Sequence, residues 1–242
     1  MAMTIPATLR RYGRMDYASA WNLQRALVQD RIENSGLDTL VLLEHEPVFT
    51  VGRRGRPDHC DEASLVESGY SVFHVERGGS VTYHGPGQVV GYPILRLSQF
   101  CSGPKIYMRL LEEVIILTLE EWDIHGARAD MLTGVWMGQE KIAAMGVRII
   151  RGVTMHGFAL NVSVDLTPFT RIVPCGIAGC QVTSMSRVLG QAVDMRAVQD
   201  CLATVFAEVF GLEWRKPDPA EVSSAESCYA GIGPSGAGRD GS

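Results

Sequence analysis

Three long segments of the chain carry apolar residues at the spacing of an amphipathic helix: 16–35, 104–122 and 194–210. In the first segment, the residues expected near the buried face are Ala20, Leu23, Leu27 and Ile32. Gly36 follows as a stop signal. In the second segment, the residues expected to face inward are Ile106, Leu110, Val114, Leu117 and Leu119. These patterns predict three helices.

The other apolar segments are short, as strands are. Residues 38–52, DTLVLLEHEPVFTVG, predict a buried strand that leads into a second extended piece after a break at Pro47. A polar loop, RRGRPDHCDEAS, follows at 53–64. Further strands are expected at 71–77, 88–97, 134–138, 141–150 and 154–164, with 171–174 as an additional candidate. Few helices and many strands indicate an α+β fold with a mixed, largely antiparallel sheet flanked by helices.

The segment between two of these strands, RGGSVTYHGPGQ at 77–88, is rich in glycine. Its turn residues are Gly78, Gly79, Gly85, Pro86 and Gly87. Arg77 and His84 supply a cation and a titratable imidazole at the two ends of the strand-like SVTY. Glycine lets a ligand approach the backbone closely, and proline fixes the turn. An ordinary hairpin accounts for GG or GPG taken alone, but the combination favours the wall of a binding site.

Cys175, in RIVPCGIAGCQVTSM, and Lys141, in GQEKIAAMGVRI, are candidates for nucleophilic catalysis. A thiol is an effective nucleophile at neutral pH when a neighbour stabilises its thiolate or accepts its proton, and a lysine can do both. Each residue also has an ordinary explanation, because free cysteines are commonly buried and a lysine at the start of a strand can be solvated. The apolar run after Lys141 favours a side chain that turns inward. Backbone amides beside the thiol, those of Gly176 and Gly179 among them, could form an oxyanion hole.

Four segments in this order resemble the lipoyl(octanoyl) transferases of lipoate biosynthesis: RGGSVTYHGPGQ, KIAAMGVRI, HGFALNV at 156–162, and PCGI with VTSM at 174–185. The resemblance spans roughly residues 15–215 and implies the fold shared by biotin protein ligases and lipoate ligases. It implies an enzyme that takes an octanoyl group from acyl carrier protein as a cysteine thioester, with no cofactor and no metal. The implied acceptors are the lysines of lipoyl domains in 2-oxoacid dehydrogenase complexes and of the glycine cleavage H protein.

The same resemblance assigns roles to particular residues. It places the nucleophile at Cys175 and, at Lys141, the lysine that lowers the pKa of this thiol. The substrate contacts that it implies are Arg77, Gly78, Gly79, Ser80, Val81, Thr82, Tyr83, His84, Ala144, Met145, Gly146, Gly157, Phe158 and Ala159. The departures from the family pattern are Cys180 in a variable stretch, Met185 in place of a commoner leucine, and Arg151 where an aromatic is common. Whether Lys141 acts as a base or only as an electrostatic partner stays open.

Three other interpretations compete with acyl transfer. A zinc site could use Cys175, Cys180, His84 and His156, but the spacing of the cysteines is loose and the histidines lie in separate motifs. An ATP-dependent lipoate or biotin ligase on the same fold would need no nucleophilic cysteine, so Cys175 in PCGI argues against it. A non-enzymatic acyl-binding module would leave the pairing of a cysteine with a lysine unexplained.

Length and composition place the chain among globular proteins. The 242 residues suit one large or two small domains. With no repeat and no linker inside 15–215, we expect a single catalytic domain at 1–215, followed by a disordered tail at 216–242 that is rich in Gly, Ser, Ala and Pro. No apolar stretch is long enough to span a membrane, and the N-terminal MAMTIPATLRRYG lacks the apolar core of a secretory signal. The six cysteines, at 60, 101, 175, 180, 201 and 228, form no CxxC pair. Reduced thiols and a cytoplasmic location are therefore expected.

The net charge of −5 excludes a broadly basic face for nucleic acid. The densest basic cluster is Arg53, Arg54 and Arg56 in GRRGRPDH. A solvated loop is its ordinary explanation, and a docking site for the strongly acidic acyl carrier protein is the functional one. We expect a monomer with no nucleic-acid or membrane partner.

Overall fold

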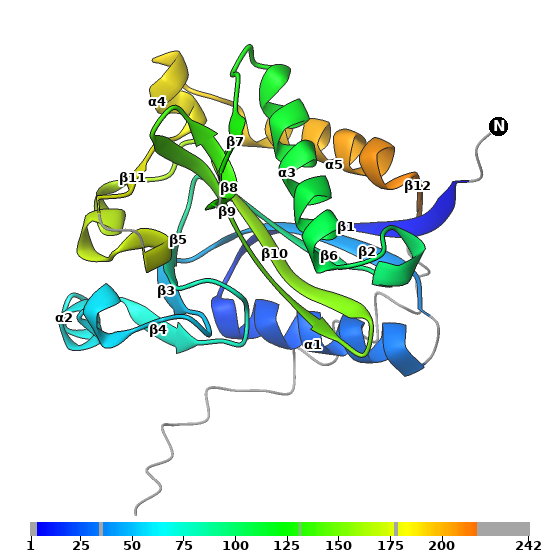
Figure 1. The fold of residues 1–242 in the computed structure, drawn as a ribbon, viewed down its shortest axis with the longest axis horizontal. Helices are drawn as coiled ribbons and strands as arrows, with labels where there is room; N and C mark the ends of the chain where they lie inside the picture. The colour runs from blue at the N-terminus through cyan, green and yellow to red at the C-terminus, as the bar shows by residue number, and fades with distance from the viewer. Residues whose placement is uncertain (1–3, 34–35, 131, 177–178, 217–242) are drawn as a thin grey trace, which may run out of the picture.

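The computed structural model describes residues 4–33, 36–130, 132–176 and 179–216, which form a main sheet of nine strands and a small sheet of three (Figure 1). The main sheet has the order β12 (Leu212–Arg215), β1 (Ile5–Met15), β2 (Asp38–His45), β6 (Gln88–Ile94), β10 (Val153–Asn161), β9 (Glu140–Ile150), β8 (Leu132–Met137) and β7 (Ala127–Ala129), and β11 (Gln181–Val182) also pairs with β9. The small sheet has the order β4 (Ser71–His74), β3 (Val48–Val51) and β5 (Val81–His84).

Most strand pairs in both sheets are antiparallel, and the exceptions are β1 with β2 and with β12, β9 with β11, and β3 with β4. The predicted α+β fold on a mixed, largely antiparallel sheet is therefore confirmed. The tail predicted at 216–242 lies outside the described residues, apart from Lys216. No helix in the described ranges is long and apolar enough to cross a membrane.

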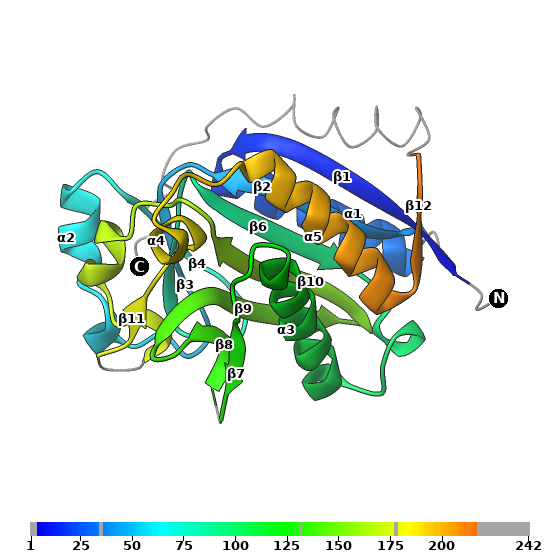
Figure 2. The same ribbon diagram turned by 90° about the horizontal axis from the view of Figure 1, so that it is seen from above.

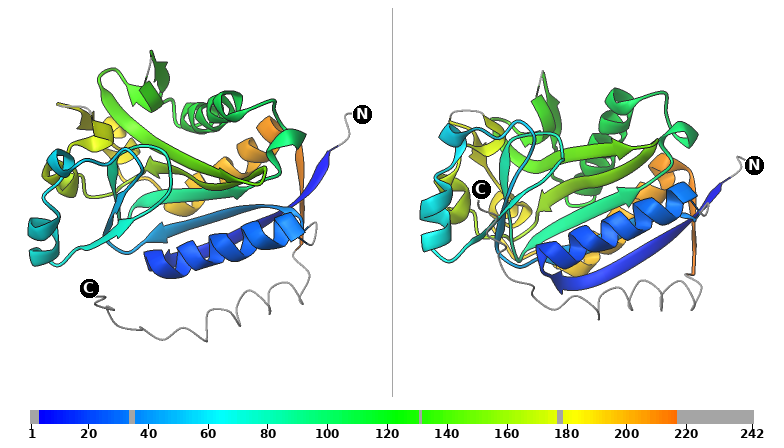
Figure 3. Two further views of the ribbon diagram at one scale, coloured as in Figure 1. Left: turned by 60° about the horizontal axis from the view of Figure 1, so that its bottom comes forward. Right: turned by 90° about the horizontal axis from the view of Figure 1, so that it is seen from below.

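Helices cover both faces of the main sheet (Figure 2). One face carries α1 (Tyr17–Glu33), and the other carries α3 (Pro104–Glu120) and α5 (Met195–Phe210). Strand β2 shows why two cores form: Leu40 and Leu42 pack with α3 and α5, whereas the alternate residues Val41 and Leu43 pack with α1. The views from below show α1 lying along its face of the sheet (Figure 3).

Shorter elements gather at one end of the main sheet. The helices there are α2 (Glu62–Glu67) and α4 (Met185–Leu189), beside the small sheet and β11 (Figure 1). The described residues also form short 3-10 helices: η1 (Pro57–His59), η2 (Leu97–Gln99), η3 (Thr167–Arg171) and η4 (Pro174–Gly176). This end of the molecule brings the glycine-rich segment and the turn that contains Cys175 close together.

Several details differ from the sequence-based expectations, and the short elements β7, β11, β12 and α4 were not among those expected. Strand β1 was not expected, because its arginines leave no clear alternation of apolar and polar residues. Helix α2 lies within and beyond the segment predicted as a polar loop, where Asp61 caps it by accepting from the Ser64 amide. The candidate strand 171–174 is wrong: η3 ends and η4 begins there, and only Ile172 makes an isolated bridge, to Cys60.

The inward face of α3 was also placed wrongly in part. Ile106 is 48% exposed, and Leu110 and Leu117 are only half-buried, whereas Val114 and Leu119 are buried as expected. The buried residues of this helix are Tyr107, Leu111, Glu112, Val114, Ile115, Thr118 and Leu119. Both stripes have helical spacing, so the apolar pattern alone could not choose between them.

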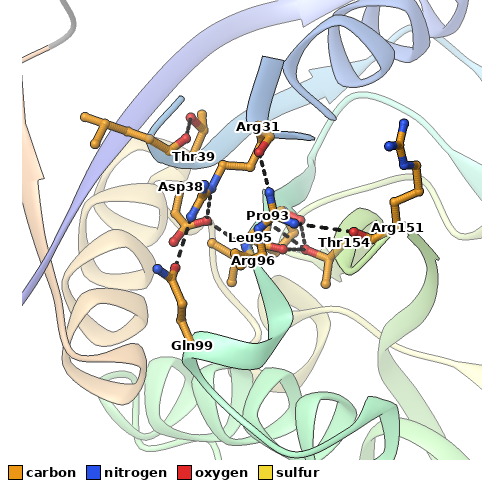
Figure 4. Close-up of polar contacts among 10 residues, drawn as sticks. Arg31, Asp38, Thr39, Pro93, Leu95, Arg96, Gln99, Arg151 and Thr154 are labelled. Atoms are coloured by element: carbon orange, nitrogen blue, oxygen red, sulfur yellow. Dashed lines mark hydrogen bonds and ion pairs between the residues drawn. The ribbon is translucent and has the colours of Figure 1, made fainter. Parts of the chain in front are cut away.

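A buried carboxylate at the start of β2 ties three elements together (Figure 4). Asp38, 1% exposed, accepts a hydrogen bond from Arg31 Nε at the end of α1 (2.8 Å) and one from the Arg96 amide after β6 (2.7 Å). The Thr154 hydroxyl on β10 donates to the carbonyl of Pro93 on β6 (2.8 Å). These contacts join α1, β2, β6 and β10 without apolar packing.

We predict that Asp38→Ala destabilises the fold by about 3 kcal/mol, because it leaves Arg31 largely buried without its counter-charge. The melting temperature should fall by roughly 6–12 °C. Glu46→Ala is the matched control, since Glu46 forms an exposed ion pair with Arg14 at 4.0 Å and should change stability by less than about 0.5 kcal/mol. Equal melting temperatures for the two variants, measured by calorimetry, would contradict this account of Asp38.

Candidate active site

A pocket opens between the glycine-rich segment and the paired strands β9 and β10. From the set of expected substrate contacts it is lined by Arg77, Gly79, Ser80, Val81, Thr82, His84, Ala144, Met145, Gly146, Gly157, Phe158 and Ala159. The pairing of β10 with β9 explains how two distant motifs meet, because Gly157, Phe158 and Ala159 stand opposite Gly146, Met145 and Ala144. Tyr17, Val90, Tyr92 and His156 complete the lining.

Two of the expected contacts, Gly78 and Tyr83, lie outside this lining. The Gly78 amide donates to the carbonyl of Val147 on β9 (3.0 Å), which holds the glycine-rich segment against the sheet. Tyr83 points to the other side of β5, where its ring packs against Phe49 and Phe169. Both residues therefore support the wall of the pocket from behind.

Arg77 shapes the glycine-rich segment from within. Its side chain is buried, and its guanidinium donates to the Thr50 carbonyl (2.7 Å), the Thr50 hydroxyl (2.8 Å) and the Gly78 carbonyl (3.0 Å). The adjoining arginine-rich loop is tied to the same segment by its backbone: the amides of Arg53 and Arg54 donate to the carbonyls of Arg77 and Gly79, both at 3.0 Å. The arginine-rich loop therefore lies at the rim of the pocket.

One side of the pocket is polar but uncharged at neutral pH. We call it the polar wall; it consists of Tyr17, His84, Tyr92 and His156. Burial lowers the pKa of His84 and of His156 to about 3, and it raises the pKa of Tyr17 to about 12. The His84 ring bonds the Gln88 side chain (2.7 Å), whereas within the described residues His156 Nε2 has no hydrogen-bond partner. His45 stands behind the polar wall, bonded to the Tyr92 hydroxyl (2.6 Å).

Lys141 lies on β9, three residues before the first pocket residue of that strand. Its side chain is turned inward as the sequence indicated, with 3% of the residue exposed. The Nζ atom donates to the Thr133 carbonyl (3.0 Å) and lies 4.6 Å from the centre of the Trp136 ring. Both contacts favour a positive charge, because a carbonyl oxygen and the face of an indole are electron-rich.

The segment that contains Cys175 approaches Lys141 through backbone pairing. Strand β11 takes a place beside β9 beyond the stretch that pairs with β10, so that Val182 stands opposite Lys141 and the Thr183 amide donates to the Lys141 carbonyl (3.0 Å). The turn η4, which includes the backbone of Cys175, packs against β5 of the pocket. The thiol of Cys175 itself lies outside what the structure describes.

His59 joins the glycine-rich segment to the cysteine turn, and the sequence did not single it out. Its Nδ1 atom bonds the Ser80 hydroxyl (2.5 Å), and its carbonyl accepts from the Val173 amide (2.7 Å). The ring lies so close to Gly176 (φ +69°) that a Cβ atom there would come within 2.8 Å of it, which explains glycine at this position. The only sequence signal for this role is the position of His59 directly after the arginine cluster.

The same region bears on two chemical expectations, an oxyanion hole and a metal site. The Gly176 amide already donates to the Val173 carbonyl (3.0 Å), so the expectation that it contributes to an oxyanion hole is wrong for this arrangement. In the described part of the chain, no three His, Cys, Asp or Glu side chains gather in a group that could hold a metal ion. His84 and His156 instead belong to the polar wall.

Comparison with known proteins identifies the family. The model of the lipoyl protein ligase A/B catalytic domain matches residues 16–207. An octanoyltransferase of Geotalea uraniireducens (strain Rf4) is 45% identical over 187 residues, which cover 77% of this chain and 85% of that protein. An octanoyltransferase of Chloroflexus aurantiacus (strain ATCC 29366 / DSM 635 / J-10-fl) is 46% identical over 213 residues, 86% of this chain and 96% of that one.

Solved structures of low sequence identity share the fold. A lipoate-protein ligase A bound with ATP is 14% identical with a TM-score of 0.72, covering 94% of this chain and 95% of its own. A biotin protein ligase from Aquifex aeolicus is 15% identical with a TM-score of 0.52, covering 84% and 70%. The predicted fold type is confirmed by these two likenesses, and the sequence matches carry the relationship further. The chain belongs to the lipoyl(octanoyl) transferases, within the lipoyl protein ligase A/B catalytic domain family.

Proposed function

We propose that this protein transfers an octanoyl group from acyl carrier protein, through a thioester on Cys175, to the acceptor lysine of lipoyl carrier domains. The observation that carries the proposal is the meeting of the pocket, the inward-facing Lys141 and the backbone of the turn η4 at one end of the sheet. The octanoyltransferase relatives support the acyl group and the reaction class. The proposed acceptors are the lipoyl domains of 2-oxoacid dehydrogenase complexes and the glycine cleavage H protein.

In the first half-reaction, the Cys175 thiolate attacks the thioester carbonyl of the donor, and a new C–S bond forms to the enzyme. The pantetheine sulfur leaves and takes a proton from the Lys141 ammonium, which becomes a neutral amine. In the second half-reaction, the acceptor amine attacks the enzyme thioester and gives its proton to Lys141, while the Cys175 thiolate leaves. The cycle therefore returns the thiolate and the ammonium to their starting states.

The acyl chain would occupy the pocket along β9 and β10. Lys141 and Ala144 are three residues apart on β9, roughly 10 Å in a strand, so the reactive carbonyl can lie near Lys141 while the chain follows the strand. The donor carbonyl is already activated as a thioester, so this reaction needs no ATP. An ATP-dependent ligase, the main rival, would have no use for the cysteine.

We predict that Cys175→Ala abolishes transfer and leaves the fold intact, because the variant lacks the sulfur that accepts the acyl group. After incubation with octanoyl-acyl carrier protein, an intact-mass spectrum should show one octanoyl increment on the wild type and none on the variant. Cys180→Ala is the matched control and should still be acylated. An adduct that maps to Cys180 or Cys101 would overturn the assignment.

Lys141 can be tested as a base with two variants. Lys141→Arg keeps a positive charge but cannot give up its proton near neutral pH, whereas Lys141→Ala lacks both properties. We predict that the Arg variant retains iodoacetamide alkylation of Cys175 but loses about 100-fold or more in single-turnover transfer, the usual contribution of a general base. Lys105→Arg on the exposed part of α3 is the control. Full transfer by Lys141→Arg would show that Lys141 acts only through its charge.

The arginine-rich loop is the proposed dock for the acidic carrier protein. Arg53, Arg54 and Arg56 are exposed at the rim of the pocket, and Arg56 is paired with the exposed Asp58 at 3.2 Å. We predict that replacing the three by Ala raises the KM for octanoyl-acyl carrier protein roughly threefold to tenfold with little change in kcat, because rim charges act mainly on encounter. Arg196→Ala on α5 is the control. An equal loss with a small octanoyl-pantetheine thioester would contradict the docking role.

A further inference from the structure

One peptide group stands between Lys141 and a buried carboxylate on α3. The carbonyl of the Thr133–Gly134 peptide accepts the hydrogen bond from Lys141 Nζ (3.0 Å). The N–H of the same peptide donates to Glu112 Oε1 (3.1 Å). Lys141 and Glu112 are therefore joined through a single polarisable unit rather than by direct contact.

Packing alone does not explain a glutamate at position 112. It is 2% exposed and lies on the buried face of α3 between Leu111 and Val114. A carboxylate in such a place is costly unless it is paired. Its pairing is complete: Oε2 lies 2.7 Å from Arg109 on the same helix and 3.3 Å from Arg128 on β7. One oxygen is thus held by two guanidinium groups, and the other faces the peptide.

The backbone at Gly134 is shaped to present this peptide to both partners. Gly134 has φ +118°, and a Cβ atom there would come within 2.6 Å of the Ala143 carbonyl and 3.3 Å of Lys141 Cε. The pairing of β8 with β9 is irregular at the next residues, Val135 and Trp136. A side chain at Gly134 would therefore strain the backbone and crowd the lysine at the same time.

We propose that Glu112 is a positioning residue that acts on Lys141 through the Thr133–Gly134 peptide. A carboxylate that accepts from the peptide N–H polarises the unit and makes its carbonyl a stronger acceptor, since hydrogen bonds in a chain reinforce one another at low dielectric. The stronger carbonyl favours the ammonium form of Lys141, fixes its direction and, through it, favours the thiolate of Cys175. The inference rests on the dyad role proposed above for Lys141.

The charged groups that face the Glu112 carboxylate are Arg109 from its own helix and Arg128 from β7, with Lys141 of β9 across the peptide. Glu113, the next residue of α3, also pairs with Arg128 and so shares a partner with Glu112, whereas Glu120 is exposed at the end of the same helix. Glu120→Gln therefore removes a carboxylate from the same helix without altering the partners of Glu112, which makes it the matched control for Glu112→Gln.

The test is the pH profile of iodoacetamide alkylation at Cys175, beside single-turnover transfer. We expect Glu112→Gln to move the alkylation profile to higher pH by about half a unit to one unit, the size of effect that one nearby charge exerts. Glu120→Gln should keep the wild-type profile. A wild-type profile for Glu112→Gln would overturn the proposal.

A double variant shows whether Glu112 acts through Lys141. In a Lys141→Ala background, Glu112→Gln should produce no further shift, because the group that it acts on is gone. A full additional shift would mean that Glu112 acts independently, and it would overturn the proposal. If Lys141→Ala alone keeps the wild-type alkylation profile, the proposed dyad is wrong. If the profile shifts in Lys141→Ala but not in Glu112→Gln, the dyad stands and only the role proposed for Glu112 is wrong.

Arg128→Gln covers the case in which Glu112→Gln does not fold. Arg128 is partly exposed, and its removal leaves Glu112 with Arg109 alone, so the carboxylate acts on the peptide with less of its charge offset. We expect the alkylation profile of this variant to move to lower pH, opposite to that of Glu112→Gln. An unchanged profile, or a move to higher pH, would show that these contacts merely hold α3 in place.

Discussion

The site depends on the burial of one primary amine. Moving an ammonium group out of water is expensive, and a protein meets that cost only when several groups replace the lost water. Around Lys141 these groups include the Thr133 carbonyl and the face of Trp136, both contributed by β8. The strand order therefore has a chemical consequence: β8 beside β9 stabilises the amine, and β11 on the other side of β9 brings the cysteine turn toward it.

The pocket combines small residues with a neutral polar wall. Ala144 and Gly146 stand opposite Ala159 and Gly157 on two central strands, so that backbone and methyl groups border part of the pocket beside the larger Met145 and Phe158. The histidines of the wall are uncharged at neutral pH because burial lowers their pKa. Protonation of His84 or His156 would require pH values several units lower, so the wall offers hydrogen-bonding groups without a fixed charge.

The sequence correctly predicted those parts of the fold in which the spacing of residues is compatible with one type of local structure only. Helices α1 and α5, the break at Pro47 and the long strands β9 and β10 fall in this class. Strand β1 was missed because its arginines interrupt the alternation of apolar and polar residues. The buried face of α3 was assigned wrongly in part because Ile106 and Tyr107 begin two apolar stripes with the same helical spacing. For the site, the glycine-rich motifs pointed to the pocket, but Glu112 carries no local signal and His59 carries only its position after the arginine cluster. Their roles arise only from contacts between elements that lie far apart in the sequence.

The pairing of β11 with β9 also bears on when the proposed dyad can assemble during synthesis. Lys141 is made before the cysteine turn, and neither can meet the other until Gln181 and Val182 have left the ribosome and joined the sheet. Strand β1 is synthesised first, but its pairing is completed later still, because one of its two neighbours, β12, is the last strand of the described chain. A nascent or unfolded chain therefore lacks the pairing that brings the backbone of the cysteine turn toward Lys141. If the proposed dyad is correct, long-range closure of the sheet thus delays its assembly until the surrounding pocket exists.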